Sequence, residues 1–341
     1  MKKTVVVTGG GTGGHLKVAD AFIEEFHKRG YKVIFIGSAN GQDPSWFEDD
    51  KRLKKAIFLD TRGVVNKNFL GKIQSLMQIV SQVSKCRTIF QKFKVSTVVS
   101  VGGFSAAPAT LAAITTVDCY LFIHEQNSVM GKLNEKTARF ASEVYSSFLV
   151  DSPIKDYPVS EEFFDNARIR DELKTVIFLG GSQGAKAIND FALSVAKDLK
   201  KLNLNIIHQT GKNDFDRVSK EYKKLGLEVD VFAFSDDLAS KMGEADFAVS
   251  RSGASTLWEL CANSLPTLFI PFPYAAKDHQ YTNAKFLENK GLCYVLRENE
   301  LSSEKFMNIL KKDNYSISKK LVDSIKYNAI ESIVDDMLGK A

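Results

Sequence analysis

Two segments of the sequence, one at its start and one near its middle, share a pattern that few folds accommodate. In each, a run rich in β-branched residues leads into a glycine-rich loop and then into a helical pattern, at residues 4–15 and 175–185. Strand, glycine turn and helix in this order are typical of the first βα unit of a Rossmann-like domain. Short strand-like runs alternate with helical patterns after both segments, which favours parallel sheets covered by helices. The sequence therefore predicts an α/β protein with two doubly wound, Rossmann-like domains facing across a cleft.

The chain length fits two domains, because 341 residues are about twice the usual size of one domain. Around residues 151–166 the alternation breaks into Ser-Pro, Tyr-Pro and acidic residues, which is typical of a linker. We therefore expect a first domain at residues 1–155 and a second at residues 156–318. Residues 319–341 predict a C-terminal helix with an apolar stripe, and we expect this helix to pack back on the first domain.

The net charge of +5 is too small to indicate a nucleic-acid partner, but it is unevenly distributed. Residues 61–117 contain no Asp or Glu, whereas Lys and Arg contribute +7 there. The four cysteines match no zinc-site spacing, which favours reduced thiols in a cytosolic protein. We expect no signal peptide, and the apolar run at residues 95–117 contains glycines and a proline that favour a strand, turn and buried helix over a membrane span.

The first glycine loop, at residues 9–15, has the composition of a phosphate site. Its glycines let the backbone approach an anion, and the start of a helix favours negative charge. The loop also satisfies G-x-G-x-x-G, but the next strand ends at Ser38 without the carboxylate that a dinucleotide ribose requires. NAD binding and a purely conformational glycine turn stay open as alternatives.

Further polar side chains follow the expected strand ends, where sheets of this kind bind ligands. These clusters lie at residues 124–134, 208–211, 251–259 and 278–283. Four histidines lie at such positions: His15, His124, His208 and His279. Each either serves a site or is a hydrogen-bonded structural residue, and His15 is the leading candidate for a general base. Asp214 and Asp216 form the one D-x-D pattern of a metal-nucleotide site, although carboxylates are ordinary at a helix start.

These motifs, in this order, resemble those of the MurG family, the GT-B glycosyltransferases that add N-acetylglucosamine to lipid I in peptidoglycan synthesis. The resemblance spans nearly the whole chain. It rests on Gly10 to His15, Gly102-Gly103-Phe104, His124 to Asn127, Gly180 to Ala185, Arg251 to Ala254 with Glu259, and Gln280 with Asn283-Ala284. It implies UDP-N-acetylglucosamine (UDP-GlcNAc) as the donor and undecaprenyl-diphosphate-linked muramoyl-pentapeptide, lipid I, as the acceptor.

The resemblance also implies a role for individual residues. The donor-binding residues would be Thr12, Gly13, Gly14, Asn127, Ser182, Gln183, Phe234, Ser235, Ala254, Ser255, Thr256, Glu259, Gln280 and Asn283. The acceptor residues would be His15, Gly102, Gly103 and Asn134. Within the donor site, Ser182 and Gln183 would serve the diphosphate and Glu259 the ribose. Phe234 and Ser235 would receive the uracil, whereas Gln280 and Asn283 would bind the sugar hydroxyls.

The sequence departs from the family pattern at three places. Ser160 stands where the family has an arginine that contacts the donor. Lys17-Val18 replaces an aromatic-proline pair after the first histidine, and the second glycine loop is shortened, at residues 102–108. These differences concern donor contacts and the acceptor loop.

The resemblance leads to a hypothesis for the reaction: an inverting transfer that requires neither a metal nor another cofactor. His15 would deprotonate the muramoyl hydroxyl, which attacks the anomeric carbon from the face opposite UDP. Amides of the loop at residues 180–185 would stabilise the departing diphosphate.

Residues 62–94 combine cations with apolar residues on two helical faces, which is typical of a peripheral membrane interface. The core-facing stripe would contain Phe69, Ile73, Leu76, Val80, Val83 and Phe90, and the outer residues would be Leu70, Met77, Ile79 and Phe93. A buried helix with a solvated basic fringe is the alternative. We expect a peripheral protein at the cytoplasmic face of the bacterial membrane. Its partners would be UDP-GlcNAc, lipid I, anionic lipid and other cell-wall synthesis proteins, but no nucleic acid.

Three other functions stay open. Another GT-B enzyme, such as a glycolipid synthase or a UDP-GlcNAc epimerase, would share the nucleotide half. An NAD-dependent oxidoreductase and a non-enzymatic membrane-surface protein belong to other classes.

Overall fold

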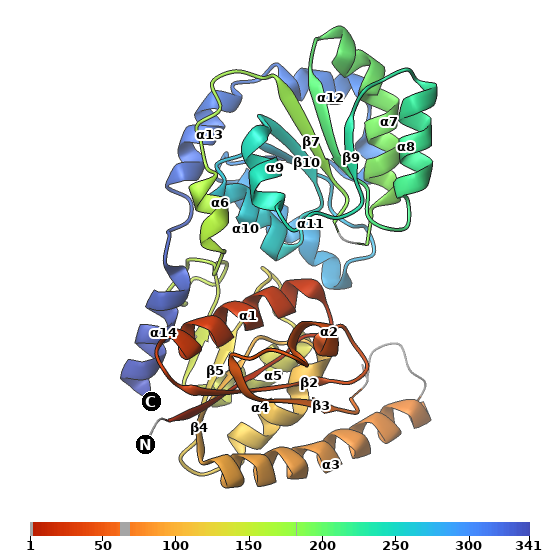
Figure 1. The fold of residues 1–341 in the computed structure, drawn as a ribbon. Coiled ribbons are helices and arrows are strands. Elements are labelled where there is room, and N and C mark those ends of the chain that lie inside the picture. The colour runs from red at the N-terminus through yellow and green to blue at the C-terminus, as the bar shows by residue number, and fades with distance from the viewer. Residues whose placement is uncertain (1–2, 62–68, 182) are drawn as a thin grey trace. The chain divides into compact units, whose positions relative to one another are not determined.

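The computed structural model describes residues 3–61, 69–181 and 183–341, with the backbone alone at residues 69–78. The chain forms two compact units, one of Met1–Pro158 with Asn328–Ala341 and the other of Val159–Tyr327. We expected the divisions at residues 155 and 318. Each unit contains a six-stranded parallel sheet with helices packed against it (Figure 1). The predicted α/β class with two Rossmann-like domains is therefore confirmed.

The sheet of the first unit has the strand order β3-β2-β1-β4-β5-β6, with parallel pairing throughout. Its strands are β1 (Thr4–Thr8), β2 (Lys32–Ser38), β3 (Leu53–Leu59), β4 (Val95–Ser100), β5 (Tyr120–His124) and β6 (Glu143–Tyr145). Its helices are α1 (Gly13–Lys28), α2 (Asp43–Phe47), α3 (Phe69–Phe93), η1 (Phe104–Ala106), α4 (Ala107–Ile114), α5 (Lys132–Thr137), η2 (Ala138–Phe140) and α14 (Ala329–Lys340). The strand order reverses between β1 and β4, so the loops after these two strands mark the position where such sheets bind ligands.

The second unit repeats this topology, in the order β12-β11-β10-β7-β8-β9. Its strands are β7 (Thr175–Leu179), β8 (Asn205–Gln209), β9 (Asp230–Phe232), β10 (Phe247–Ser250), β11 (Thr267–Phe269) and β12 (Tyr294–Val295). Its helices are α6 (Glu161–Asp165), α7 (Lys186–Lys201), α8 (Phe215–Lys224), α9 (Leu238–Glu244), α10 (Ala254–Ala262), η3 (Ala276–Asp278), α11 (His279–Glu288), η4 (Glu298–Glu300), α12 (Ser303–Leu310) and α13 (Asn314–Val322). The corresponding reversal lies between β7 and β10.

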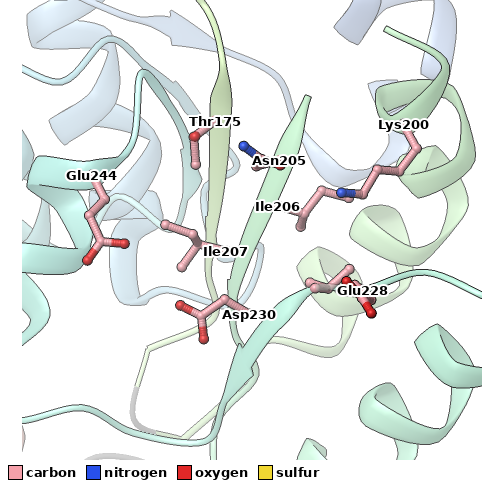
Figure 2. A pocket seen from close by; sticks show the side chains of 9 residues that line it. Thr175, Lys200, Asn205, Ile206, Ile207, Glu228, Asp230 and Glu244 are labelled. Atoms are coloured by element: carbon pink, nitrogen blue, oxygen red, sulfur yellow. The ribbon is translucent and has the colours of Figure 1, made fainter. Parts of the chain in front are cut away.

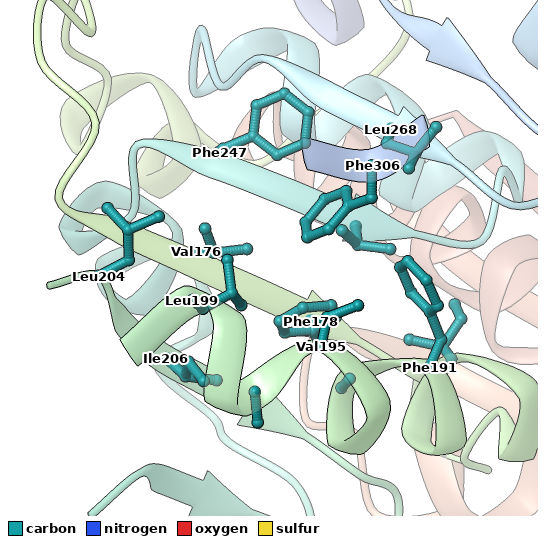
Figure 3. Close-up of a cluster of buried hydrophobic side chains, with 14 of the residues drawn as sticks. Val176, Phe178, Phe191, Val195, Leu199, Leu204, Ile206, Phe247, Leu268 and Phe306 are labelled. Atoms are coloured by element: carbon teal, nitrogen blue, oxygen red, sulfur yellow. The ribbon is translucent and has the colours of Figure 1, made fainter. Parts of the chain in front are cut away.

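Helix α7 shows how the sequence builds the core of the second unit. Its buried residues Ile188, Val195 and Leu199 recur at helical spacing and form one apolar face. This face packs on the strand β7, whose Val176 and Phe178 are also fully buried (Figure 3). Burial of each such side chain stabilises the fold by about 1.5–3 kcal/mol. The glycine loop between β7 and α7 is thus attached to two well-anchored elements.

Helix α3 corrects one detail of the predicted apolar stripe. Val80 was expected to face the core but is 70% exposed, whereas Phe93, expected outside the stripe, packs against the core. The buried positions along the described part of the helix are Gln82, Cys86 and Phe90. They are four residues apart and therefore lie along one face of the helix, which includes the predicted Phe90 but not Val80. Gln82 and Cys86, which the predicted stripe left out, take core positions on this face. Among the described helices, none is long and apolar enough to cross a membrane.

The C-terminal segment also differs from the prediction of a single helix. It forms two helices, α13 in the second unit and α14 in the first, and they are separated where Asn328 adopts a left-handed conformation with φ of 65°. Helix α14 packs against α1, where Arg29 pairs with Asp335 and donates to the Glu331 carbonyl. The expected return of the C-terminal helix to the first domain is therefore confirmed.

Candidate active site

The loops after β1 and β4 meet backbone to backbone. The Gly10 N–H donates to the Gly102 carbonyl at 3.2 Å. Gly103 has a φ of +83°, and a side chain at this position would collide with the Gly10 carbonyl. Glycine is therefore required here both for conformation and for the close approach of the two loops. Within the first unit, the structure thus places the first glycine loop, which leads into the predicted donor residues Gly13 and Gly14, against the predicted acceptor residues Gly102 and Gly103.

His15 lies in the first turn of α1, which begins directly after Thr12. Its Nδ1 is 2.9 Å from the Thr12 hydroxyl oxygen. When Nδ1–H donates to this oxygen, the proton is absent from Nε2, which then carries the lone pair that a general base needs. The geometry therefore suits His15 for the base role that the sequence predicts.

Glu125, at the end of β5, is a functional candidate to which the sequence alone gave no role. The residue is 97% buried, and its carboxylate accepts three hydrogen bonds. The donors are the backbone N–H groups of Asn127 and Gly131, both at 3.0 Å, and the side-chain amide of Asn134 at 2.8 Å. One buried carboxylate thus holds two predicted site residues, Asn127 and Asn134. The sequence signals were its place in the polar cluster after an expected strand and in the motif His124 to Asn127, and neither gave Glu125 a role of its own.

The amide of Asn134 is oriented by this contact. Because a carboxylate only accepts hydrogen bonds, the nitrogen of the amide must face Glu125. The Asn134 oxygen is buried and has no hydrogen-bond partner among the described residues. The amide also lies against Gly102, where an added Cβ would be 3.1 Å from the Asn134 nitrogen. The predicted acceptor residues Gly102 and Asn134 are therefore neighbours.

His124, the residue before Glu125, is a core side chain. It is fully buried between the rings of Phe22 and Tyr157, at centroid distances of 5.9 and 5.7 Å. Neither ring nitrogen has a hydrogen-bond partner among the described residues. Burial, with a smaller contribution from His15, lowers the pKa of His124 to about 3. The imidazole is therefore neutral at physiological pH and belongs to the packing of the first unit.

In the second unit, the loop after β7 closes against the loop after β8. The Gly180 N–H donates to the Gln209 carbonyl at 2.9 Å, and a side chain at Gly211 would collide with the backbone of Gly184. Gln183 lies in this loop, whereas Ser182 lies outside the described residues. The predicted diphosphate loop thus has a close backbone contact like that of the first unit.

His208, in the strand β8, and Asp214, at the start of α8, both contact other side chains of the second unit. His208 is buried, with Nδ1 2.9 Å from the Tyr222 hydroxyl and Nε2 3.0 Å from the Asn189 side-chain oxygen. Its pKa is lowered to about 3, chiefly by burial. Asp214 accepts from Arg217 and Asn189, and its hydrogen bond from Arg217 lowers its pKa. Both residues thus have structural roles.

Among residues 3–61, 69–181 and 183–341, no group of three or more His, Cys, Asp or Glu side chains is arranged to hold a metal ion. Asp214, the first residue of the D-x-D pattern, lies at the start of α8 and pairs with Arg217.

The loop after β10 and the start of α11 form the second cluster of predicted donor residues. Ala254, Ser255 and Thr256 make up the first turn of α10, and Glu259 is 96% buried one turn later. The Ser252 hydroxyl donates to the Gln280 carbonyl at 2.8 Å, and the buried Asn283 donates to the Ser252 carbonyl at 3.3 Å.

The side chain of Gln280 is also fixed, because its oxygen accepts from the Phe272 N–H at 3.0 Å. Its amide nitrogen therefore remains the group that can donate to a ligand. Phe234, expected to receive the uracil, is 49% exposed and lies 6.0 Å from the Lys212 ammonium, near the loop after β8. Ser235 accepts from the Asp237 N–H. Ser160, the departure from the family pattern, is exposed directly before α6.

A cavity of about 380 Å³ lies at the opposite edge of the second sheet (Figure 2). Its lining includes Thr175, Asn205 and Asp230, which begin the strands β7, β8 and β9. The predicted donor residues instead follow the carboxyl ends of the strands. Since parallel sheets of this kind bind ligands at the carboxyl ends, this cavity is separate from the candidate site.

Two family models together match most of the chain. The glycosyltransferase family 28 N-terminal domain matches residues 5–146, and the family 28 C-terminal domain matches residues 175–336. A relative from Campylobacter jejuni is 48% identical over 98% of this chain and 97% of its own, and one from Sulfurovum sp. is 47% identical over 97% of both. Both relatives are named UDP-N-acetylglucosamine–N-acetylmuramyl-(pentapeptide) pyrophosphoryl-undecaprenol N-acetylglucosamine transferase.

A solved structure agrees with these matches. The crystal structure of Acinetobacter baumannii MurG superposes with a TM-score of 0.84 at 27% identity and covers 99% of each chain. The 48% identity to the relatives over nearly the full length identifies a common family, and the superposition shows the common fold. The chain therefore belongs to glycosyltransferase family 28, within the MurG family of N-acetylglucosamine transferases.

Proposed function

We propose that the chain transfers N-acetylglucosamine from UDP-GlcNAc to the C4 hydroxyl of the muramoyl sugar of lipid I, which forms lipid II and releases UDP. The observation that carries this proposal is the 48% identity, over nearly the full length of both chains, to relatives that bear this activity in their names. The polar groups gathered at the carboxyl ends of both parallel sheets support it, because each unit then supplies one substrate site.

The second unit would bind the donor. The first-turn N–H groups of α10, at Ala254, Ser255 and Thr256, suit an anion, since a helix start carries positive partial charge. Gln183 and Ser182 would extend the diphosphate site. The carboxylate of Glu259 would accept from the ribose hydroxyls. The amide nitrogen of Gln280 would donate to a sugar oxygen while Asn283, through Ser252, keeps the segment in place.

The first unit would bind the acceptor and carry the base. In the reaction, Nε2 of His15 accepts the proton of the C4 hydroxyl as its oxygen forms a bond to the anomeric carbon. The bond from that carbon to the UDP diphosphate breaks on the opposite face, and UDP keeps the electron pair. Thr12, Gly13, Gly14 and Asn127 would contact the donor sugar and the diphosphates. Electrostatic stabilisation by helix starts and loop amides would take the place of a metal ion.

The first unit would bind the membrane surface through residues 62–94. In the described part of this region, Lys85, Arg87, Lys92 and Lys94 are exposed, as is Val80. Exposed cations and an exposed apolar side chain in one region suit an anionic bilayer, where each cation contributes about 1 kcal/mol to binding. We propose a peripheral position at the cytoplasmic face of the membrane, where lipid I is accessible and other cell-wall synthesis proteins would be partners.

Calorimetric titration tests the donor half of the proposal. UDP-GlcNAc should bind the full chain, whereas NAD should give no heat of binding. Glu259→Ala should weaken UDP-GlcNAc binding about tenfold through loss of the ribose contacts. Glu228→Ala, an exposed change at the opposite edge of the same sheet, serves as the control and should leave the affinity unchanged. Equal affinity of the Glu259 variant and the wild type would contradict the ribose role.

Chelation tests the metal-free mechanism. Turnover of a lipid I analogue should persist after removal of divalent ions with EDTA. Loss of turnover that is restored only by a divalent ion would refute this part of the proposal.

A further inference from the structure

Asp43, the first residue of the short helix α2, places a fully buried carboxylate beneath the first glycine loop. One carboxylate oxygen accepts from the Gly11 N–H at 2.7 Å, and the other accepts from the Ser38 N–H at 2.8 Å. The carboxylate therefore joins the loop after β1 to the end of β2. Hydrogen bonds to an ionised carboxylate are among the stronger ones in proteins, so both backbone segments are held firmly.

Glycines surround this carboxylate on several sides. A Cβ at Gly10 or at Gly37 would lie 2.7 Å from a carboxylate oxygen, and a Cβ at Gly41 would lie 3.2 Å from one. Gly11 has a φ of +83° and leaves no room for a Cβ beside the Phe104 ring. Part of the glycine content of the loop thus accommodates an internal carboxylate.

This arrangement changes what the loop can offer to a substrate. The Gly10 N–H donates to the Gly102 carbonyl, and the Gly11 N–H donates to Asp43. In a phosphate-binding glycine loop, such N–H groups would point at the anion. Here an internal carboxylate occupies that position for Gly11. Diphosphate binding by this loop therefore begins after Gly11, at Thr12 and the start of α1.

We infer that Asp43 is a positioning residue for the acceptor half of the site. It fixes the turn from which α1 starts, and through Gly11 it sets the place of Thr12 and of His15, whose Nδ1 contacts the Thr12 hydroxyl. This inference rests on the proposed function, because His15 is the base of that reaction. Asp43 itself touches no substrate, since its carboxylate is fully buried.

The variant Asp43→Asn tests the inference with little change in shape. Asn has one accepting oxygen, so its NH2 group must face either the Gly11 or the Ser38 N–H. We expect kcat to fall about 10- to 100-fold, the range associated with loss of a charge-assisted hydrogen bond. The KM for UDP-GlcNAc should stay within about twofold, because the second unit binds the donor.

Asp50→Asn is the matched control. The Asp50 side chain is also buried in the first unit, but among the described residues its carboxylate accepts hydrogen bonds from Arg52 rather than from the glycine loop. It should lower stability without lowering kcat at a temperature where the protein is folded. An equal loss of kcat in both variants would assign Asp43 to general stability and overturn the inference.

A double-variant cycle with His15→Ala separates positioning from an independent effect. If Asp43 acts through His15, Asp43→Asn should cost little further activity once His15 is absent. If the activity losses of the two single variants multiply in the double variant, the inference is overturned. The proposed function would still stand in that case, because it rests on the formation of lipid II by the wild type.

A readout that needs no turnover completes the test. In proton NMR titrations, Asp43→Asn should shift the pKa or the chemical shifts of the His15 ring and leave those of His27 unchanged. An unaltered His15 titration would overturn the inference. A wild type that fails to use lipid I would instead refute the proposed function, and the NMR result would still decide whether Asp43 positions His15.

Discussion

Replacing His124 with Phe should remove one source of acid sensitivity from the first unit. The imidazole is fully buried, contacts the Phe22 and Tyr157 rings edge-on, and has no hydrogen-bond partner among the described residues. A phenyl ring can make the same ring contacts without losing a hydrogen bond. At pH 8 the free energy of unfolding should therefore change by no more than about 1 kcal/mol.

The difference should emerge as the pH falls. Burial lowers the pKa of His124 from 6.5 to about 3, so between these values the unfolded chain binds a proton that the folded chain does not. Stability from this group is fully present above pH 6.5 and is lost progressively as the pH falls toward 3. The loss amounts to about 2 kcal/mol at pH 5 relative to pH 8, since each pH unit below 6.5 costs about 1.4 kcal/mol.

Urea unfolding of the wild type and of His124→Phe at pH 8 and pH 5 measures this difference. Hydrogen exchange then assigns the change in stability to the first or the second unit. Wild type should lose about 2 kcal/mol more than His124→Phe in the first unit. His208→Phe is the contrasting variant, because it removes the partners of Tyr222 and Asn189. It should destabilise the second unit by about 2 kcal/mol or more even at pH 8. A parallel loss of stability in wild type and His124→Phe on acidification would refute the assignment of His124 as a neutral core residue.

Three further variants test other contacts. Glu125→Gln should lower the free energy of unfolding of the first unit by about 2 kcal/mol and reduce kcat/KM for lipid I, because one donor facing it loses its acceptor; unchanged kinetics would show that the segment containing Asn134 needs no such anchor. Arg170→Met should destabilise the second unit by about 3 kcal/mol in urea unfolding, since the buried guanidinium donates to Asn263 and to three backbone carbonyl groups nearby. Phe234→Ala should weaken UDP binding in calorimetry about tenfold while leaving the unfolding midpoint unchanged, because the ring is half exposed; a lower midpoint with unaltered binding would assign Phe234 to the fold.

The architecture could be predicted because it is encoded locally. Strand runs such as residues 4–8 and 175–179 are continuous and apolar, as strands buried on both faces must be, and glycines mark their ends. The phase of α3 could not be predicted as well. Cys86 and Gln82 occupy core positions, and an apolar pattern alone does not show which of several neighbouring residues a packed helix will bury.

Candidate site residues could be named from the sequence where a motif contains them, but not where a contact depends on loop geometry. His15 and Asn134 follow from sequence patterns. The role of Glu125 depends on the loop that follows it, which brings the donors of Gly131 and Asn134 to its carboxylate. The sequence did not predict a role for Asp43, because the carboxylate that we expected was one at the end of β2 that binds a ribose. Asp43 instead lies on α2, and its carboxylate accepts from the Gly11 N–H. Long-range hydrogen bonds of this kind have no spacing that a sequence pattern can reveal.

The central claim is the transfer of N-acetylglucosamine to lipid I, and it is tested most directly by following a labelled sugar from the donor into the products. The full chain would be incubated with UDP-GlcNAc labelled in the sugar and with lipid I, and the products would be separated. Transfer predicts that the label appears in a lipid-linked disaccharide and that one UDP is released for each sugar transferred. Label found only in free N-acetylglucosamine, or in an epimerised UDP-sugar with no UDP released by transfer, would contradict the claim.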